Sequence, residues 1–382
     1  MESYLELLHL LEGFVHGHKP DIRKDANFSK IYKLSNIHSI TGVVGYMSYQ
    51  YPSLIPSPWK EKFEYDSAAS VGIMSLKMEQ LKTIEKIFES QGISYLLFKG
   101  AVIKDVYPVQ ELRTFGDIDL LIHPEDRDKV NSLFIKNGFV CTENWEPVYS
   151  YHKSKSIYEV HTELLDTQVA KCNIFFKDNT WECAVPLTKY RYTFTDEYHF
   201  VYLMTHLAKH VKGSGAGVRM ILDLALMIEK RNLDFEWIES VLKITGLTSF
   251  SNYIFAFLSE YLNCDVPMDY EIPEDLSLFM EYIMEAGIFG KDGRDMGVAA
   301  LKTSKSSKYS QIVRYIFPKA ETISSRYTYL QKRPYLLPVA WVHRAVITAS
   351  HTGHHISRAV SMAKADEKEV DRLKKMNESL GL

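Results

Sequence analysis

Three short motifs contain the side chains of this chain that could do chemistry together. They are Lys99-Gly100, Asp117-Ile118-Asp119 and Glu159-Val160-His161. Each adjoins or lies within a short apolar run that predicts a buried strand. Because residues i and i+2 of a strand point to the same face, Asp117 and Asp119 are expected to project together while Ile118 faces the core. The two carboxylates repel each other, which favours a bound cation.

Glu159 adds a third carboxylate if its strand lies beside the Asp-x-Asp strand. Such an all-oxygen cluster suits Mg²⁺ or Mn²⁺ better than zinc, which prefers histidine and cysteine ligands. An isolated Asp-x-Asp pair is more often a polar strand edge. Here the upstream turn at Lys99 can present backbone N–H groups to a phosphate chain, and Lys99 or Arg113 can neutralise its charge. Metal-binding carboxylates facing a phosphate-binding turn are parts of a phosphoryl or nucleotidyl transfer site.

The segments that must position these motifs alternate between helix and strand. Apolar residues at helical spacing over 67–90 predict a long helix that Gly92 ends. The remaining predicted elements of this region are helices at 101–106 and 124–137 and strands at 93–98, 116–122, 139–142, 148–152 and 156–164. This interleaving predicts an α+β fold with a small mixed sheet flanked by helices.

The regions on either side are predicted to be helical. An amphipathic pattern followed by the Pro-rich passage YPSLIPSPWK predicts an N-terminal arm or cap over 1–65, before a core over 66–195. A C-terminal helical domain is expected over 196–382, with helices at 199–211, 218–230, 235–244, 249–262 and 276–286. The charged segment KADEKEVDRLKKMNESL predicts a solvated final helix.

Composition excludes several classes of protein. The 382 residues are 46% hydrophobic and 24% charged, as in globular proteins, and their net charge of -3 argues against general nucleic-acid binding. The four cysteines form no CxxC pair, so neither a thiolate zinc site nor a disulfide framework is indicated. Acidic residues near the N-terminus and the lack of a long apolar run predict a cytoplasmic protein with no membrane partner.

A family resemblance rests on these motifs. The stretch LLFKGAVIKDVYPVQELRTFGDIDLLIHPEDRDKVNSLFIKNGF resembles the nucleotidyltransferase core of the DNA polymerase beta superfamily. Its Lys-Gly turn, the arginine before Asp-x-Asp and the later acidic-x-His are similar to a bacterial family of uncharacterised nucleotidyltransferases. The similarity continues through THLAKHVKGSGAGVRMILDLALMI and, more faintly, through IFPKAETISSRYTYL and LLPVAWVHR, so it spans most of residues 90–345. Lys99-Gly100 replaces the superfamily's usual Gly-Ser turn, and Glu159 stands where aspartate is commoner.

The resemblance implies a metal-dependent nucleotidyltransferase. Such an enzyme moves a nucleoside monophosphate from a nucleoside triphosphate, ATP included, to a hydroxyl of an unknown small-molecule or protein acceptor and releases pyrophosphate. It implies that Asp117, Asp119 and Glu159 bind two Mg²⁺ or Mn²⁺ ions, with Glu159 as a ligand, as the base that takes the hydroxyl proton, or as both. The other residues that it places around the nucleotide are Lys99, Gly100, Arg113, His161, Lys209, His210, Arg219 and Asp223.

Alternative interpretations stay open at several positions. Arg219 and Asp223 are equally well explained as an ion pair on one helix face. His206 and His210 have the i, i+4 spacing of zinc ligands, but no third ligand is evident. The histidines of SHTGHHISR predict a surface turn. For the whole chain, the transferred group could be another phosphoryl unit, or a degenerate transferase core could bind a nucleotide in a regulatory protein. The presence of three acidic residues argues against the regulatory interpretation.

Overall fold

The computed structural model of the chain describes residues 1–164, 169, 171–213, 215–287, 301, 308–324, 327, 329–351, 360 and 362–382. These residues belong to two compact units. The first comprises Met1–Lys209, Ala216–Ile288 and Gly381, and the second comprises His210–Gly215, Phe289–Leu380 and Leu382. All three chemical motifs lie in the first unit. His354 and His355 of the expected surface turn lie outside the described residues.

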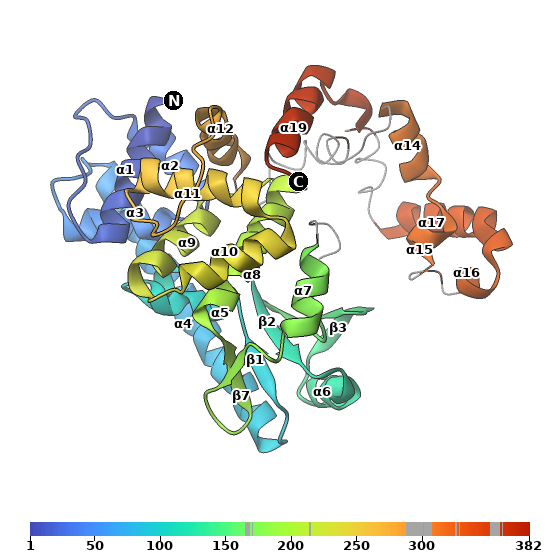
Figure 1. Ribbon diagram of the computed structural model, residues 1–382. Coiled ribbons are helices and arrows are strands. Elements are labelled where there is room, and N and C mark those ends of the chain that lie inside the picture. Colours follow the sequence, from blue (N-terminus) through green and yellow to red (C-terminus); the bar gives the residue numbers. More distant parts are fainter. Residues whose placement is uncertain are drawn as a thin grey trace. The chain divides into compact units, whose positions relative to one another are not determined.

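A mixed sheet organises the first unit (Figure 1). Its strands are β1 (Tyr95–Leu97), β2 (Asp117–Ile122), β3 (Val140–Trp145), β4 (Val148–Lys153), β5 (Ser156–His161), β6 (Ala184–Pro186) and β7 (Arg191–Phe194). In the described residues the seven strands follow the order β3-β4-β5-β2-β1-β7-β6. Strand β2 runs antiparallel to β1 and parallel to β5, and β1 runs parallel to β7. The mixed directions confirm the predicted α+β class.

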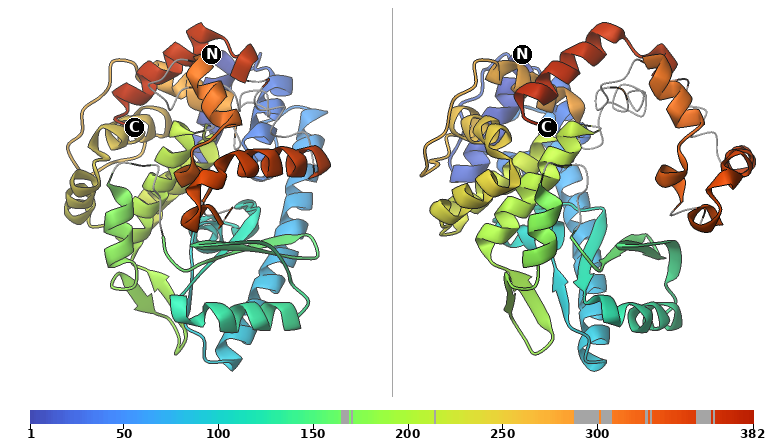
Figure 2. Two further views of the ribbon diagram at one scale, coloured as in Figure 1. Left: turned by 90° about the vertical axis from the view of Figure 1, so that its right-hand side faces the viewer. Right: turned by 45° about the vertical axis from the view of Figure 1, so that its right-hand side comes forward.

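Two helices cover one face of the sheet, α4 (Trp59–Ser90) and α6 (Arg127–Lys136), and Figure 2 shows α4 running alongside it. Alternate residues of β2, namely Ile118, Leu120 and Ile122, are buried against these helices. Each fully buried aliphatic side chain contributes about 1.5–3 kcal/mol to folding. Because side chains alternate along a strand, this packing directs the acidic residues of β2 to the other face.

The other face of the sheet has an aromatic layer beside its polar residues. Phe98 follows β1, and its ring centroid lies 5.0 Å from that of His161 and 5.5 Å from that of Tyr202. Tyr202 belongs to helix α8 (Asp196–Lys212), which therefore packs on this face. His161, the last residue of β5, thus lies against an aromatic ring rather than in open solvent.

Further helices complete the first unit. They are α1 (Glu2–His16), α2 (Phe28–Ile37), α3 (Thr41–Gln50), α5 (Gly100–Ile103), α7 (Cys172–Asn179), α9 (Val218–Lys230), α10 (Phe235–Thr245), α11 (Thr248–Leu262) and α12 (Leu276–Ala286), with short 3-10 turns at Lys104–Val106, Gln110–Leu112 and Pro124–Asp126. Helix α1 contacts α2 and α3 as well as α9 and α11. The N-terminal helices therefore pack on the helices that follow the sheet.

A buried histidine joins three of these segments. His38 follows α2, and its Nδ1 accepts a hydrogen bond of 3.2 Å from the Val218 N–H. Nε2 therefore carries the ring proton and donates it to the Met284 carbonyl at 3.1 Å. Burial lowers the pKa of His38 to about 4, so the ring stays neutral near pH 7.

The second unit is helical. Its described elements are α14 (Lys308–Ile316), α15 (Ala320–Ile323), α16 (Tyr329–Lys332), a 3-10 turn at Pro334–Leu336, α17 (Leu337–His351) and α19 (Glu367–Ser379). Tyr327, Leu330 and Ala340 form a small core. Helix α19 confirms the predicted final helix, and the Asp366 side chain caps it by accepting a bond from the Lys368 N–H. None of the described helices combines the length and the apolar composition needed to cross a membrane.

Most of the predicted elements are present in the structure. The structure also contains elements that were not predicted. Helices α9 and α12 begin and end where the sequence places them, whereas α4 begins at Trp59 rather than at residue 67. Helices α2 and α3 and strands β6 and β7 have no counterpart among the predicted elements. The division at residues 65 and 195 stays a prediction.

Close packing of α3 on α4 leads to the first test. A Cβ added at Gly45 of α3 would lie 2.3 Å from the Phe63 carbonyl oxygen and 2.6 Å from the Ser67 Cβ, whereas one at Gly72 of α4 would meet nothing within 4 Å. We expect Gly45→Ala to destabilise the protein by about 1–3 kcal/mol. Gly72→Ala should stabilise it by about 0.5–1 kcal/mol. Urea unfolding measures both, and similar effects of the two variants would contradict this packing.

Candidate active site

Parallel pairing of β2 with β5 brings the acidic residues together. Asp119 lies opposite Glu159 in the register, and Leu121 lies opposite His161. Asp117 precedes Asp119 by two residues and shares its face of the sheet. One potential ligand atom from each of Asp119, Glu159 and His161 lies within 4.8 Å of the other two. The predicted neighbourhood of the two acidic motifs is therefore present.

Lys99 forms an ion pair with the central carboxylate. Its Nζ donates to Asp119 Oδ1 at 2.6 Å, and the two side chains are 16% and 3% exposed. Burial alone would lower the pKa of Lys99 and raise the pKa of Asp119. The opposite charges reverse both effects, so the pKa of Lys99 is raised and that of Asp119 is lowered. Both groups are therefore charged at neutral pH.

His161 contacts two of the acids. Its Nε2 lies 3.2 Å from Asp119 Oδ1 and 3.6 Å from Glu159 Oε2. A carboxylate oxygen only accepts, so Nε2 must carry a proton to bond with Asp119. The imidazole therefore orients the Asp119 carboxylate from β5, which lies on the other side of β2 from β1.

Asp117 carries a charge that its surroundings compensate poorly. Burial raises the pKa of this carboxyl, and the negative charge of Asp119 raises it further. Lys99 opposes these effects without reversing them. A divalent cation would relieve both the burial and the repulsion, and carboxylate oxygens are the ligands that Mg²⁺ and Mn²⁺ prefer. The donor set of Asp117, Asp119 and Glu159 thus fits the metal that the sequence implies.

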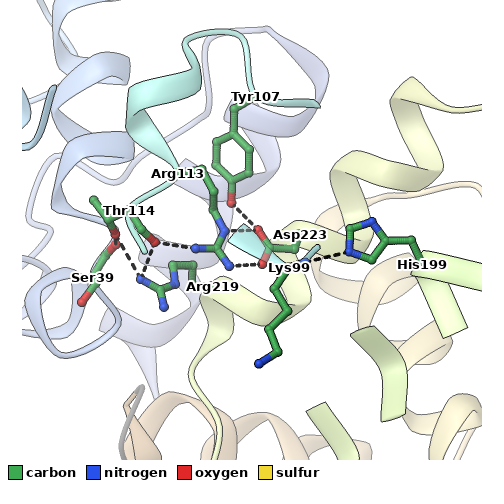
Figure 3. A network of polar contacts seen from close by, with 8 residues as sticks. All are labelled: Ser39, Lys99, Tyr107, Arg113, Thr114, His199, Arg219 and Asp223. Carbon is green, nitrogen blue, oxygen red and sulfur yellow. Dashed lines mark hydrogen bonds and ion pairs between the residues drawn. The ribbon is translucent and has the colours of Figure 1, made fainter. Parts of the chain in front are cut away.

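The backbone at Lys99 is held in an unusual conformation. Its φ of 52° and ψ of -133° lie in a region that residues other than glycine rarely adopt. The Lys99 N–H donates to Nε2 of His199 on α8 at 3.0 Å. Burial lowers the pKa of His199 to about 3, which keeps this ring neutral and able to accept the bond. Figure 3 shows His199 on the backbone of Lys99 while the lysine side chain points away.

Gly100 directly after this lysine is required by close packing. A Cβ at this position would lie 2.6 Å from the Cβ of Phe115. The absence of a side chain lets α5, which begins at Gly100, approach the segment that leads into β2.

A buried ion pair anchors that segment. Nε and Nη2 of Arg113 donate to the two carboxylate oxygens of Asp223 on α9, each at 2.6 Å (Figure 3). Tyr107 donates to the same carboxylate at 2.8 Å. Arg113 is 6% exposed and Asp223 is 2% exposed. Removing one partner of such a pair generally costs about 3–5 kcal/mol, because the other charge stays buried.

Two further cations hold the residues between Arg113 and β2. Nη1 of Arg219 donates to the carbonyl and hydroxyl oxygens of Thr114 at 2.9 and 3.0 Å, and the hydroxyl donates to the Ser39 carbonyl. Nζ of Lys77 on α4 donates to the Phe115 carbonyl at 2.6 Å and to the next carbonyl as well. The segment that leads into the acidic strand is therefore held by hydrogen bonds from α9 and α4 and by one to Ser39.

Most of the predicted site residues fall into two groups, and Lys209 and His210 belong to neither. The first group contains Lys99, Gly100, Asp117, Asp119, Glu159 and His161, and the second contains Arg113, Arg219 and Asp223. Asp223 pairs with Arg113 and not with Arg219, the partner considered from helical spacing. The charge of Asp117 acts on Lys99 and on both guanidinium groups. Lys209 and His210 lie near the end of α8 in different compact units, and their role at the nucleotide stays a prediction.

Sequence reasoning did not identify three residues that shape the site. His199, Tyr107 and Lys77 support it by hydrogen bonds to residues far along the chain. A histidine on a helix and a lysine on an amphipathic helix carry no spacing signal of their own. Their partners are fixed only by the tertiary fold.

Comparison with known proteins agrees with this geometry. Residues 24–263, more than half of the chain, match the model of a family described as uncharacterised nucleotidyltransferases. The chain belongs to this family and is a nucleotidyltransferase, as its motifs predicted. The match begins before the expected residue 90 and ends before the expected residue 345. No curated protein and no solved structure matches the chain.

The His199 contact generates a test at this site. We expect His199→Ala to destabilise the protein by about 1–3 kcal/mol, because the Lys99 N–H loses its acceptor. His199→Gln keeps an acceptor and should lose less. Urea unfolding measures both variants.

The pH dependence of unfolding adds a second readout for the same variants. The pKa of His199 is about 3 in the folded protein, below its usual value of about 6.5 in an unfolded chain. Its contribution to stability is full above pH 6.5 and is lost as the pH falls toward 3. His199→Gln should therefore show a shallower acid loss than the wild type. Equal slopes would show that the ring is not neutral in the native state.

Proposed function

We propose that this nucleotidyltransferase uses Mg²⁺ or Mn²⁺ to move a nucleoside monophosphate from a nucleoside triphosphate to an acceptor hydroxyl. The observation that carries the proposal is the parallel register that sets Glu159 beside Asp119, with Asp117 on the same face. The charges of Asp119 and Glu159 both raise the pKa of Asp117, so a bound cation would relieve the repulsion among the three carboxylates. Their oxygen atoms suit hard divalent ions that also bind substrate phosphates.

Each residue has a proposed role. Asp117 and Asp119 hold the metal ions, and Glu159 completes the set or takes the proton of the acceptor hydroxyl. A metal ion bound there would stabilise charge on the attacking and leaving oxygens. The hydroxyl oxygen forms a bond to the α-phosphorus while the bond to the bridging oxygen breaks, and pyrophosphate leaves.

Lys99 is the cation that we assign to the phosphates. Its ammonium group faces the acidic cluster, and its backbone is held by His199 independently of the side chain. The side chain can therefore turn from Asp119 to a phosphate without disturbing the fold. The proposed phosphate role of Arg113 would have to be exerted with its Nε and Nη2 held by Asp223.

The acceptor and the compartment complete the proposal. A hydroxyl on a small molecule or on a protein would suit the chemistry, and ATP is one of the triphosphates to test. Free thiols at all four cysteines support a reducing compartment such as the cytoplasm.

A second function is favoured by one observation. The ammonium group of Lys99 lies 2.6 Å from Asp119 and already neutralises it. In an active transferase, a metal ion would take this place beside Asp119. A protein that senses a nucleotide without turning it over would need no more than this. The two functions differ in whether metal binding and product formation accompany nucleotide binding.

Metal binding provides the first test of the proposal. We expect calorimetry to show Mg²⁺ binding about 5–150-fold more tightly with a nucleoside triphosphate than without, because phosphate oxygens complete its coordination and draw Lys99 from Asp119. Asp119→Asn should remove this gain. Asp128→Asn, an exposed acid on α6, is the matched control and should keep it. Equal affinity with and without ATP, GTP, CTP and UTP would contradict the metal assignment.

Transfer itself provides the second test. The protein is incubated with Mg²⁺ and each triphosphate labelled at the α-phosphate, and mass spectrometry follows the protein and its co-purified small molecules. We expect label in one product and release of pyrophosphate, with Asp117→Asn and Asp119→Asn slower by about 10²-fold or more. Asp128→Asn should behave as the wild type. Triphosphate binding without product would instead support the sensor.

A further inference from the structure

Three side chains outside the acidic cluster converge beside the end of helix α1. His16 is the last residue of α1, Glu229 belongs to the final turn of α9, and Cys264 follows α11. One donor atom from each lies within 4.8 Å of the donor atoms of the other two. All three belong to the first compact unit. The set combines nitrogen, oxygen and sulfur donors, so it differs in chemistry from the acidic cluster.

The His16 ring is oriented as metal-binding histidines commonly are. Its Nε2 lies 2.8 Å from the Leu262 carbonyl oxygen, which can only accept, so Nε2 carries the ring proton. Nδ1 then points its lone pair toward a carboxylate oxygen of Glu229, 3.7 Å away. A lone pair and a carboxylate repel each other unless a second ring proton or a metal ion stands between them. Ligand histidines typically donate their other N–H to a carbonyl in this way.

The buried thiol decides which metal fits. Cys264 is 3% exposed, so its sulfur lies where little water reaches it. Cysteine binds a metal ion as the thiolate, so the ion that takes its proton's place must have a strong affinity for sulfur. Mg²⁺ and Ca²⁺ bind oxygen ligands and do not meet this requirement. Zn²⁺ binds sulfur, imidazole nitrogen and carboxylate oxygen.

We propose that Nδ1 of His16, the carboxylate of Glu229 and the sulfur of Cys264 form a Zn²⁺ site with a fourth position for water. Bonds of about 2.0–2.3 Å in tetrahedral geometry hold such ligand atoms about 3.3–3.5 Å apart. The Glu229 side chain is 25% exposed and can turn to close the remaining distance. As the sulfur–zinc bond forms, the thiol proton passes to solvent.

A bound ion would join three helices. Helix α1 already contacts α9 and α11, and the proposed ligands come from the ends of these same helices. The site lacks a sequence signature because its residues are 16, 229 and 264, far apart along the chain. A search for CxxC pairs therefore could not find it.

The test uses the full-length protein under reducing conditions. It is incubated with ZnCl₂, freed of unbound metal by gel filtration, and analysed for zinc by mass spectrometry. We expect one bound ion per chain, with binding weakened at least about tenfold in Cys264→Ala and His16→Gln. Cys183→Ala, at a thiol outside the set, should bind as the wild type does. Asp119→Asn should also retain the ion, which separates this site from the acidic cluster.

Cobalt substitution supplies a readout that does not depend on the folding of a variant. Co²⁺ bound by the wild-type protein should show a thiolate-to-metal charge-transfer band and the intense visible bands of tetrahedral geometry. The proposal is overturned if the wild type binds no zinc, if Co²⁺ lacks the thiolate band, or if both ligand variants bind zinc as tightly as the wild type. Loss of the ion in Asp119→Asn alone would also overturn it. His16 and Glu229 would then form an ion pair through a second ring proton.

Discussion

The buried pair of Arg113 and Asp223 is the contact on which the geometry of the site depends. It ties the segment before β2 to helix α9, and both charged side chains are almost fully buried. Arg219 and Lys77 fasten the next residues through backbone carbonyls. The start of the acidic strand is consequently placed by cations that never touch its carboxylates. Preorganisation of this kind keeps charged ligands apart and available.

The acidic cluster itself is a balance between burial and charge. Lys99 and His161 satisfy Asp119, so this carboxylate is ionised although it is almost fully buried. Asp117 has no ion pair among the residues that the structure describes, and its pKa is raised by burial and by the charge of Asp119. One end of the cluster is therefore neutralised by Lys99, while at the other end the charge of Asp117 is opposed by burial and by its acidic neighbours. The two aspartates therefore differ: Asp119 is paired with the cation that the protein supplies, Lys99, and Asp117 is not.

The sequence predicted the shared face of the two aspartates because side chains alternate along a strand with a period of two. Once 116–122 is taken as a strand, the shared face of Asp117 and Asp119 follows, and burial of Ile118 confirms it. Helix α3 escaped prediction because TGVVGYMSYQ is buried on several sides and shows no apolar stripe. Strand β7 pairs in parallel with β1 across most of the core sequence. Asp223, the partner of Arg113, and His199, the partner of the Lys99 N–H, lie 110 and 100 residues away, where no local pattern can select them.

The bond between His38 and Met284 also has a consequence for the order of events during synthesis. Its two ends are separated by 246 positions. A ribosome adding about 5–20 residues per second takes about 12–50 s to span that interval. Throughout it, the His38 ring lacks this acceptor, although α4, α9 and α11, against which the N-terminal helices pack, are synthesised earlier. This one bond therefore forms late, and the last turn of α12 completes a contact that begins at the end of α2.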